Sequence, residues 1–369
     1  MQDVVIVGAG LIGCGIAYEL AKRGASVTVY DRAEPARAAS WAGAGMLAPY
    51  SEEVVDPALL ALCAASLRAF PAFVDELRER TGVDSHLRTE GTLHVAFDEA
   101  SARGRSAQCE AFRRNGAEAS LLDRDATLAR EPMIGGSVRG SVFVANEAHV
   151  DNRRLGRALF AACTDAGVRF ERTDGVALEA DTRRVRGIRT EHGFSAAATV
   201  VNAAGAWAGQ LPGVPVAAQV AVRPVAGEML ALAVPKGFTR GLVWAQHVYL
   251  VPRDDGRLLI GATSVERDFD VRVTAHGVAA LLSVALRIAP VLGTFALVES
   301  WAGLRPASHD GRPYLGATSI DGYVVAAGHY RNGILLTPVT AQALAAVIAG
   351  ERPAVDLQAF DPQRTPEAA

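Results

Sequence analysis

Three glycines near the start of the chain have the spacing of a nucleotide-binding turn. Gly8, Gly10 and Gly13 follow the apolar run Val4–Val7 in a G-x-G-x-x-G pattern. In such a turn the first glycine allows the tight bend, the second lets a pyrophosphate approach the backbone, and the third lets the helix pack closely on the strand. Asp31 ends the next strand pattern about 20 residues later, where an acid can bind a ribose hydroxyl. The pattern predicts a dinucleotide site and does not distinguish FAD from NAD.

Two further stretches carry small or polar residues where a ligand could meet the backbone. "AAGHYRNGILL", which begins at Ala326, is a polar turn that runs into an apolar helical pattern. Backbone N–H groups at the start of a helix can bind an anion or a ring carbonyl. The strand pattern "ATVVNAAGAWAG" ends in Ala203, Ala204 and Gly205, and ligands of open α/β sheets lie at the carboxyl ends of strands. Both stretches are therefore candidate ligand contacts.

The composition of the 369-residue chain is that of a globular protein with room for two cores. Half of the residues are hydrophobic, and the net charge of −3 provides no basic field for nucleic acid or an anionic membrane. A strand pattern that starts at Val4 leaves no room for a signal peptide, and no apolar stretch is expected to be long enough to span a bilayer. The separated cysteines form no C-x-x-C pair, which argues against a metal site and favours reduced thiols in a soluble, cytoplasmic protein. These cysteines are Cys14, Cys63, Cys109 and Cys163.

The elements that must position these residues combine helical and strand patterns. Pro57–Thr81 is predicted to be an amphipathic helix that ends before Gly82, and Asp151 is a candidate N-cap of a second helix–strand unit. Arg88–Phe97 and Val220–Ser264 alternate and carry β-branched or aromatic residues, as in an antiparallel sheet. The sequence therefore predicts an α/β fold in which a nucleotide-binding domain is interrupted twice by a second domain. The predicted ranges are 1–85, 150–218 and 300–369 for the first domain and 86–149 and 219–299 for the second, with a Pro-rich, poorly ordered tail from Arg352.

Five further sequence blocks give the chain a resemblance to a known family. They are "SWAGAGMLAP", "VVNAAGAWA", "YLVPRDDGRLLIGATSVERDFD", "SWAGLRPASHDGRPYLG" and "GHYRNGILLTP". In their order and spacing the chain resembles the D-amino acid oxidase family, and most closely its glycine oxidase branch, the flavoenzymes of bacterial thiamine biosynthesis. The resemblance covers nearly the whole chain. Its specific parts are "WAGLRP" and "GHYRNGILL", because G-x-G-x-x-G is shared by many folds.

The resemblance implies a Rossmann-like FAD-binding domain and a second, antiparallel-sheet (α+β) substrate-binding domain. In the family the N-terminal helix faces the FAD pyrophosphate, and the turn before the last helix, here Gly328–Leu335, faces the isoalloxazine ring. Backbone N–H groups there stabilise negative charge on the reduced flavin. Arg32 could indicate NADP, but an ordinary surface arginine is the preferred interpretation. No cysteine follows Cys163 and the first histidine is His86, so the FAD is expected to be held non-covalently.

The resemblance further implies oxidation of a small amino acid, such as glycine, sarcosine, another N-substituted glycine or a small D-amino acid. The carboxylate is held, a hydride leaves Cα for the flavin, and water releases an oxo acid and ammonia or an amine. Molecular oxygen is the expected acceptor and yields hydrogen peroxide. A D-amino acid dehydrogenase with another acceptor and a flavin-binding tRNA-modifying module stay open as alternatives. A homo-oligomer is expected from the family, whereas nucleic acid and membrane are not expected partners.

Three residues match positions that line the substrate site in the family, and a fourth candidate, Arg331, lies in the flavin-facing turn. Arg305 in "WAGLRP" matches the carboxylate-binding arginine, whose planar guanidinium can form two parallel hydrogen bonds with a carboxylate. Tyr249 matches a tyrosine that binds the same carboxylate, Met46 matches a methionine beside the flavin, and Arg331 could add a second positive charge. The alternatives are a surface ion pair, core side chains and a structural cap. The predicted cofactor-binding residues are Gly8, Gly10, Leu11, Ile12, Gly13, Asp31, Arg32, Ser40, Ala42, Gly43, Gly45, Met46, Val176, Ala204, Gly205, Trp207, Arg305, His329, Tyr330, Arg331, Asn332, Gly333, Ile334 and Leu335.

The roles of three more residues stay open at the level of the sequence. His329 could be a general base, but a structural role is preferred because hydride transfer needs no side-chain base when the amine is neutral. Glu228 stands where relatives often have glutamine, so it is either solvated or paired with an unseen partner. Ser264 occupies a position where at least one glycine oxidase branch has methionine, and its small size predicts room for N-substituted glycines.

Overall fold

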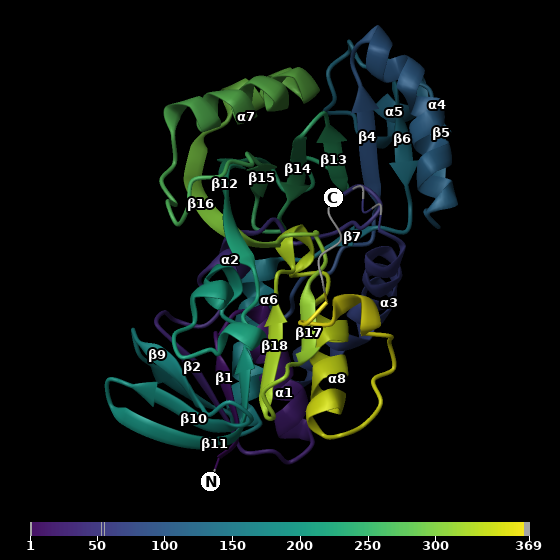
Figure 1. Cartoon of the computed structure of the whole chain (residues 1–369). Coiled ribbons are helices and arrows are strands. Elements are labelled where there is room, and N and C mark those ends of the chain that lie inside the picture. Colours follow the sequence, from purple (N-terminus) through teal and green to yellow (C-terminus); the bar gives the residue numbers. More distant parts are fainter. Residues whose placement is uncertain (1, 53, 55, 365–369) are drawn as a thin grey trace.

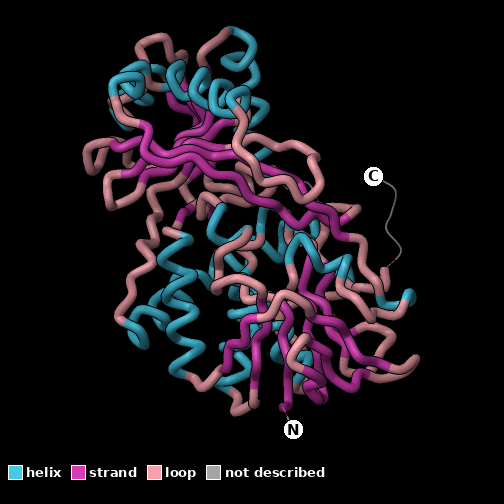
Figure 2. The backbone as a smooth tube through the Cα atoms, turned by 90° about the vertical axis from the view of Figure 1, so that its left-hand side faces the viewer, coloured by secondary structure: helices cyan, strands magenta, loops and turns pink. Residues whose placement is uncertain are grey.

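The computed structural model describes residues 2–52, 54 and 56–364, whose strands form two large sheets in separate halves of the molecule (Figure 1). Figure 2 shows that the strands of the two halves run in crossed directions. A small third sheet pairs β3 (Met46–Leu47) with β7 (Ala148–His149), which lies near the junction. The predicted α/β class, with one parallel and one antiparallel sheet, is confirmed.

The sheet of the first half is mainly parallel, as the apolar N-terminal run predicts for a strand buried on both faces. β1 (Gln2–Val7) lies between β11 (Gly193–Asn202) and β2 (Val27–Asp31) and is parallel to both. Val5 and Ile6 are fully buried on opposite faces, because helices cover one side of the sheet and an antiparallel meander covers the other. The remaining strands are β8 (Arg169–Arg172), β9 (Val176–Ala180), β10 (Val185–Thr190), β17 (Tyr314–Ala317) and β18 (Tyr323–Ala327).

A group of helices packs together on one face of this sheet, and its ends follow the sequence signals. Asp151 accepts hydrogen bonds from the backbone N–H groups of Arg153 and Arg154 at 3.0 Å each, so the predicted N-cap is confirmed. Gly82 follows the helix that begins at Pro57 and ends it in a left-handed conformation, with a φ of +70°. The helices are α1 (Leu11–Lys22), α3 (Pro57–Thr81), α6 (Asn152–Asp165) and α8 (Thr337–Ile348).

Helix α3 has the predicted bounds but corrects one expectation. By length and composition alone it could cross a membrane, since an 18-residue window has a mean hydropathy of 1.7. The prediction that no apolar stretch is long enough is therefore wrong. In the structure, Cys63, Phe70 and Leu77 of α3 pack into the core that α1, α6 and α8 share. One face of α3 is therefore buried in this core, and 39% of its apolar window is buried.

The sheet of the second half confirms the antiparallel strands predicted for residues 88–97 and 220–264. β13 (Leu242–Ala245) and β4 (Thr92–Ala96) run parallel, whereas the other described neighbours run antiparallel. Helix α7 (Ala275–Ile288) covers the face away from the first half, and α4 (Glu99–Arg114) packs on the end of the sheet formed by β4, β5 and β6. The remaining elements of this half are β5 (Ala119–Leu122), α5 (Arg124–Arg130), β6 (Gly140–Val144), β12 (Val222–Ala233), β14 (Val248–Pro252), β15 (Arg257–Gly261) and β16 (Leu297–Ser308).

Each sheet draws on distant parts of the chain. The strands of the first large sheet lie within residues 2–31, 169–202 and 314–327, and those of the second lie within 92–144 and 222–308. Strand β16 therefore runs through the predicted boundary at residue 300. The division of the chain into two domains at the stated boundaries remains a prediction.

The tail after Arg352 corrects a second expectation. Phe360 is 1% exposed, and Arg364 pairs with Asp310 through Nε and Oδ2 at 2.8 Å. The tail up to Arg364 is therefore held against the first half by a buried ring and an ion pair, although its composition predicts poor order. Residues 365–369 lie outside the described residues.

Candidate active site

The glycine-rich turn joins β1 to α1 where the sequence predicts it. Gly8 has a φ of +110°, and a Cβ atom there would lie 2.3 Å from the carbonyl oxygen of Ala203. A Cβ atom on Gly13 would lie 1.9 Å from the carbonyl oxygen of Gly8, so α1 can approach the turn this closely only without a side chain. The start of α1 at Leu11 lines a cavity, where its N–H groups and dipole suit a phosphate group.

Asp31 lies at the end of β2, beside the turn. Its carboxylate accepts hydrogen bonds from the backbone N–H groups of Ala9 at 2.7 Å and Ala33 at 2.9 Å. Since a carboxylate has about four acceptor sites, oxygen lone pairs remain for a ribose hydroxyl. Arg32 is exposed, and its guanidinium stacks over the Trp207 ring at 3.7 Å from the centroid. This arginine therefore packs on the cavity wall in addition to lying on the surface.

A cavity of about 1560 Å³ runs along the junction of the two halves and brings most of the predicted site residues together. Gly13, Asn332 and Leu335 are buried and do not line it. Their positions, one beneath the glycine-rich turn and two before α8, suit a supporting role. The predicted residues that line the cavity are Gly8, Gly10, Leu11, Ile12, Asp31, Arg32, Ser40, Ala42, Gly43, Gly45, Met46, Val176, Ala204, Gly205, Trp207, Tyr249, Arg305, His329, Tyr330, Arg331, Gly333 and Ile334.

Arg305 and Tyr249 meet in this cavity from different strands. The guanidinium of Arg305, on β16, lies over Gly227, where a Cβ atom would be 2.3 Å from Nη1. Tyr249, on β14, uses the space left by Gly261, where a Cβ atom would be 2.9 Å from the hydroxyl oxygen. Burial raises the pKa of Tyr249, and although the charge of Arg305 opposes this, the hydroxyl keeps its proton and can donate. The two glycines thus make room for a cation and a hydroxyl donor at one place.

The structure adds Glu52 to the predicted residues at this end of the cavity. Nη1 of Arg331 lies 3.1 Å from Oε2 of Glu52, and both residues line the cavity. Burial opposes the charge on Arg331, but the carboxylate of Glu52 and the side chain of Tyr330 together outweigh it and raise the pKa of Arg331. In the sequence, Glu52 is one of two acids at the end of a loop that reads as a connector, and no spacing rule links it to Arg331.

The closing turn places α8 beside α1. The turn includes a short 3₁₀ helix, η4 (Tyr330–Asn332), and Gly15 of α1 packs against Ala341 of α8, since a Cβ atom on Gly15 would lie 3.1 Å from that side chain. Nε2 of His329 lies 3.2 Å from Oγ1 of Thr340 on α8. Burial lowers the pKa of His329 to about 3, so the ring is neutral at physiological pH. These contacts support a structural role for His329.

Glu228 is buried and has a partner, Arg267, which was one of the two interpretations left open. Its side chain is 3% exposed, and Oε1 lies 2.5 Å from Nη2 of Arg267. The backbone N–H of Thr274 also donates to Oε2, at 3.1 Å. The pair ties residues 263–274, which bring Ser264 to the cavity wall, to strand β12.

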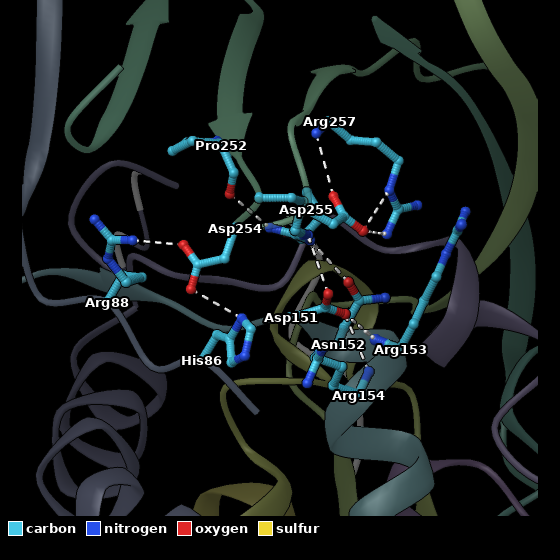
Figure 3. Close-up of polar contacts among 12 residues, drawn as sticks. His86, Arg88, Asp151, Asn152, Arg153, Arg154, Pro252, Asp254, Asp255 and Arg257 are labelled. Carbon is cyan, nitrogen blue, oxygen red and sulfur yellow. Dashed lines mark hydrogen bonds and ion pairs between the residues drawn. The ribbon is translucent and has the colours of Figure 1, made fainter. Parts of the chain in front are cut away.

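A buried polar cluster holds the loop that lines the cavity. Arg253, in the turn between β14 and β15, donates from Nη2 to the carbonyl oxygen of Ala44 at 2.7 Å and to Oδ1 of Asn152 at 3.0 Å. Asn152 in turn donates to the carbonyl oxygen of Ser40 at 2.7 Å. Figure 3 shows Asn152 at the start of α6, below the turn that carries Asp254. Burial lowers the pKa of Arg253 to about 10, so the guanidinium stays charged and fixes the loop backbone from both halves.

A second buried network fixes the same loop next to Glu52. The hydroxyl of Ser51 lies 2.7 Å from Nε2 of His94 and donates to Oε2 of Glu147 at 2.5 Å. Glu147 also accepts from the backbone N–H groups of Tyr50 at 3.0 Å and Ser51 at 2.8 Å. Burial raises the pKa of Glu147 to about 7 and lowers the pKa of His94 to about 3. Sequence reasoning missed this network because its members are far apart and form no motif.

The cavity has the features that FAD requires. The glycine-rich turn is a cradle that a Cβ atom would fill, the start of α1 suits the pyrophosphate, and Asp31 suits the ribose. The cavity continues from there past the loop at Ser40–Met46 to the closing turn, so an extended dinucleotide can contact each predicted segment.

Comparison with known proteins agrees with this geometry. The model of the family described as "FAD dependent oxidoreductase" (DAO) matches residues 3–347. The glycine oxidase of Geobacillus kaustophilus is 37% identical over 362 residues, which cover 97% of this chain and 96% of that protein. The crystal structure of glycine oxidase from that species matches with a TM-score of 0.92 over 98% of both chains.

Two further relatives extend the comparison. A bifunctional ThiO/ThiG protein of Synechocystis sp. is 36% identical over 98% of this chain, which spans only 54% of that protein's length. The iminodiacetate oxidase of Chelativorans sp. BNC1 is 28% identical, with a TM-score of 0.89 over 99% of this chain and all of that one. The predicted resemblance is confirmed: the chain belongs to the D-amino acid oxidase (DAO) family of FAD-dependent oxidoreductases, in its glycine oxidase branch, and FAD is its cofactor.

Proposed function

We propose that this FAD-dependent amino acid oxidase acts on glycine and on small or N-substituted amino acids, including sarcosine and small D-amino acids. The products are an oxo acid, ammonia or an amine, and hydrogen peroxide. The meeting of Arg305 and Tyr249 in the cavity carries the proposal, because a guanidinium fork and a hydroxyl donor together suit a carboxylate. The names of two relatives, glycine oxidase and iminodiacetate oxidase, support it.

In the proposed reaction the side chains bind and orient the substrate. Arg305 and Tyr249 bind the carboxylate and thereby direct Cα toward the cofactor, and Met46 borders the same space. FAD, when bound, supplies the acceptor for the hydride that leaves Cα. Arg331 adds positive charge beside the site, and Glu52 balances that charge. The cavity-lining members of the predicted cofactor-binding set contact the FAD, with residues 1–85, 150–218 and 300–369 as its domain and 86–149 and 219–299 as the substrate domain.

The finer assignments concern acceptor, pathway, compartment and assembly. Molecular oxygen is the proposed acceptor, and the ThiO/ThiG relative supports a place in thiamine biosynthesis. The four cysteines lie in the described part of the chain as buried free thiols, which suits the cytoplasm. β16 lies at the end of its sheet and exposes Leu297 and Val298, half of whose surface is accessible, which supports a homo-oligomer.

The visible spectrum of the purified holoenzyme tests the proposal directly. Glycine or sarcosine added without oxygen should bleach the flavin, and admitting oxygen should restore its colour and produce hydrogen peroxide. Flavin that bleaches but is reoxidised only by a quinone would favour the dehydrogenase alternative. Bound flavin that stays oxidised with glycine, N-substituted glycines and small D-amino acids would overturn the proposed activity.

A further inference from the structure

The loop Ser40–Met46 lines the cavity, and several of its carbonyl oxygens are bound by groups outside the loop. The pairs are the Ser40 and Trp41 carbonyl oxygens with Nδ2 of Asn152 at 2.7 and 3.1 Å, that of Ala42 with Nε1 of Trp301 at 2.9 Å, that of Ala44 with Nη2 of Arg253 at 2.7 Å, and that of Gly45 with the N–H of Val150 at 2.9 Å. None of these donors, all within the described chain, lines the cavity. The bound carbonyl oxygens therefore lie on the side of the loop that faces away from the cavity.

Arg253 is the charged member of this group of donors. Figure 3 shows the turn that carries Pro252 and Asp254, and with them Arg253, above the start of α6. The side chain of Arg253 is 3% exposed, and Oδ2 of Asp151 lies 4.0 Å from its Nε, beyond hydrogen-bond distance. A buried charge is costly unless it forms strong hydrogen bonds, and a charged donor binds a carbonyl oxygen more strongly than a neutral one. The carbonyl group of Ala44 is therefore firmly held.

The held carbonyl groups also set the direction of the N–H groups that follow them. In a trans peptide unit the C=O of one residue and the N–H of the next point in opposite directions. The bond from Arg253 to Ala44 thus sets the direction of the N–H of Gly45. The bond from Val150 to Gly45 does the same for the N–H of Met46. Gly45 and Met46 both line the cavity, on the side opposite to these donors.

Glycines let the loop fit closely between its donors and the closing turn. Gly45 has a φ of +77°, and a Cβ atom there would lie 1.9 Å from the carbonyl oxygen of Val150 and 3.3 Å from Nη2 of Arg253. A Cβ atom on Gly43 would lie 2.7 Å from Cδ1 of Ile334, in the turn expected to face the isoalloxazine ring. The backbone at Gly43–Met46 is therefore fixed next to the part of the cavity that suits the flavin ring.

We propose that Arg253 and Trp301 are positioning residues for the flavin. By holding carbonyl oxygens of the loop, they direct the N–H groups of Gly45 and Met46 toward the isoalloxazine ring. N–H groups fixed in advance stabilise negative charge, so they favour the reduced flavin over the oxidised one. The inference requires only that the chain binds FAD, and it is independent of which amino acid is oxidised.

The midpoint potential of the bound flavin, measured by reductive titration of the holoenzyme, tests the proposal. Arg253→Met should weaken binding of reduced FAD relative to oxidised FAD by about tenfold, which lowers a two-electron potential by about 30 mV. Arg257→Met is the matched control. It removes a guanidinium of the same polar cluster, which pairs with Asp255 at 2.8 Å, and should leave the potential unchanged. An unchanged potential in Arg253→Met, or an equal shift in Arg257→Met, would overturn the proposal.

Trp301→Phe provides a second variant in case Arg253→Met does not fold. It keeps an aromatic ring beside Trp41, whose centroid lies 5.9 Å away, and removes only the N–H that binds Ala42. The potential should change in the same direction, by about threefold in relative affinity for reduced FAD. An unchanged or higher potential would contradict the role of the held carbonyl groups.

Hydrogen exchange of the unmodified protein tests the direction of the N–H groups without any variant. Binding of FAD should slow exchange in the peptide that contains residues 43–47 by about tenfold, and Trp301→Phe should reduce this protection. Exchange that FAD leaves unchanged would overturn the proposal. Neither measurement requires turnover, so the result stands even if glycine is not oxidised.

Discussion

The two ends of the cavity are built from different parts of the polypeptide. At the cofactor end, the groups suited to bind the ligand come mainly from the backbone of one continuous stretch. Gly8–Gly13 and Asp31 belong to a single strand–helix–strand unit. At the substrate end, Glu52, Tyr249 and Arg305 are side chains from three segments far apart in the chain. Residue spacing in the sequence therefore predicts the cofactor end of the cavity. The substrate end depends instead on how distant segments are arranged in the folded chain.

The difference follows from the chemistry of the two ligand groups. A pyrophosphate is bound by N–H groups that nearly every residue carries, so the sequence needs mainly to remove side chains from the turn. A carboxylate needs a guanidinium and a hydroxyl, and each here requires space that a glycine on a neighbouring strand provides. Gly227 makes room for Arg305, and Gly261 makes room for Tyr249. Glycine thus serves both ends, as bare backbone at one and as space for a side chain at the other.

Gly13→Ala should have the largest effect and should act on the cofactor end. The new Cβ atom would meet the carbonyl oxygen of Gly8 at 1.9 Å, and neither backbone can move without shifting α1. We expect loss of most of the bound FAD and a free energy of unfolding lower by about 2–3 kcal/mol. Visible absorbance per protein and urea unfolding measure these. Gly175→Ala, where a Cβ atom meets nothing within 4 Å, is the control. Full FAD content in Gly13→Ala would contradict the close packing of α1 on the turn.

Arg305→Ala should show the opposite pattern, with flavin retained and catalysis lost. Removing the cation that we propose binds the carboxylate should lower kcat/KM for glycine by about a hundredfold to a thousandfold. Arg103→Ala removes an exposed arginine of α4 and should leave kcat/KM unchanged. If flavin content and turnover fall together in Arg305→Ala, then Arg305 belongs to the cofactor end and the contrast between the two ends fails.

Glu147→Gln tests whether ionisable side chains support the substrate end. Burial raises the pKa of Glu147 from 4.5 to about 7, so folding disfavours its charged form. Its contribution to stability is complete below about pH 4.5 and is lost as the pH rises through about 7. Relative to Glu147→Gln, the unmodified protein should therefore lose about 3 kcal/mol of unfolding free energy between about pH 4.5 and about pH 8.

Denaturant unfolding of the holoenzyme at the two pH values measures this change. Glu110→Gln, an exposed acid on α4, serves as the control and should follow the unmodified protein. A pH dependence that is the same with and without Glu147, or of opposite sign, would show that this carboxyl group is not held in the described environment.

Glu52→Gln should have the smallest effect of the four. The amide keeps the shape of the side chain but removes the charge that pairs with Arg331 at 3.1 Å. We expect kcat/KM for glycine to fall about tenfold, as for loss of one charge-assisted contact, with FAD content unchanged. Glu99→Gln, an exposed acid, controls for net charge. Unchanged kinetics in Glu52→Gln would limit the substrate end to Arg305 and Tyr249.

The predictions that the structure confirms depend on short-range patterns. The bounds of α3, the N-cap at Asp151 and the parallel β1 each follow from a few neighbouring residues. The structure corrects or extends the sequence predictions where contacts between distant segments fix the position of a residue. The tail is held because Phe360 finds a buried position, and Glu52 reaches Arg331 although 279 positions separate them.

By itself the sequence determined the family, the cofactor and the glycine-rich turn, because these depend on which residues follow one another along the chain. Only the tertiary structure decided that Glu52 balances Arg331, and that Gly227 and Gly261 make room for Arg305 and Tyr249. The physical reason is that these contacts join atoms whose separation is set by sheet register and by the packing of two halves, which no local spacing encodes.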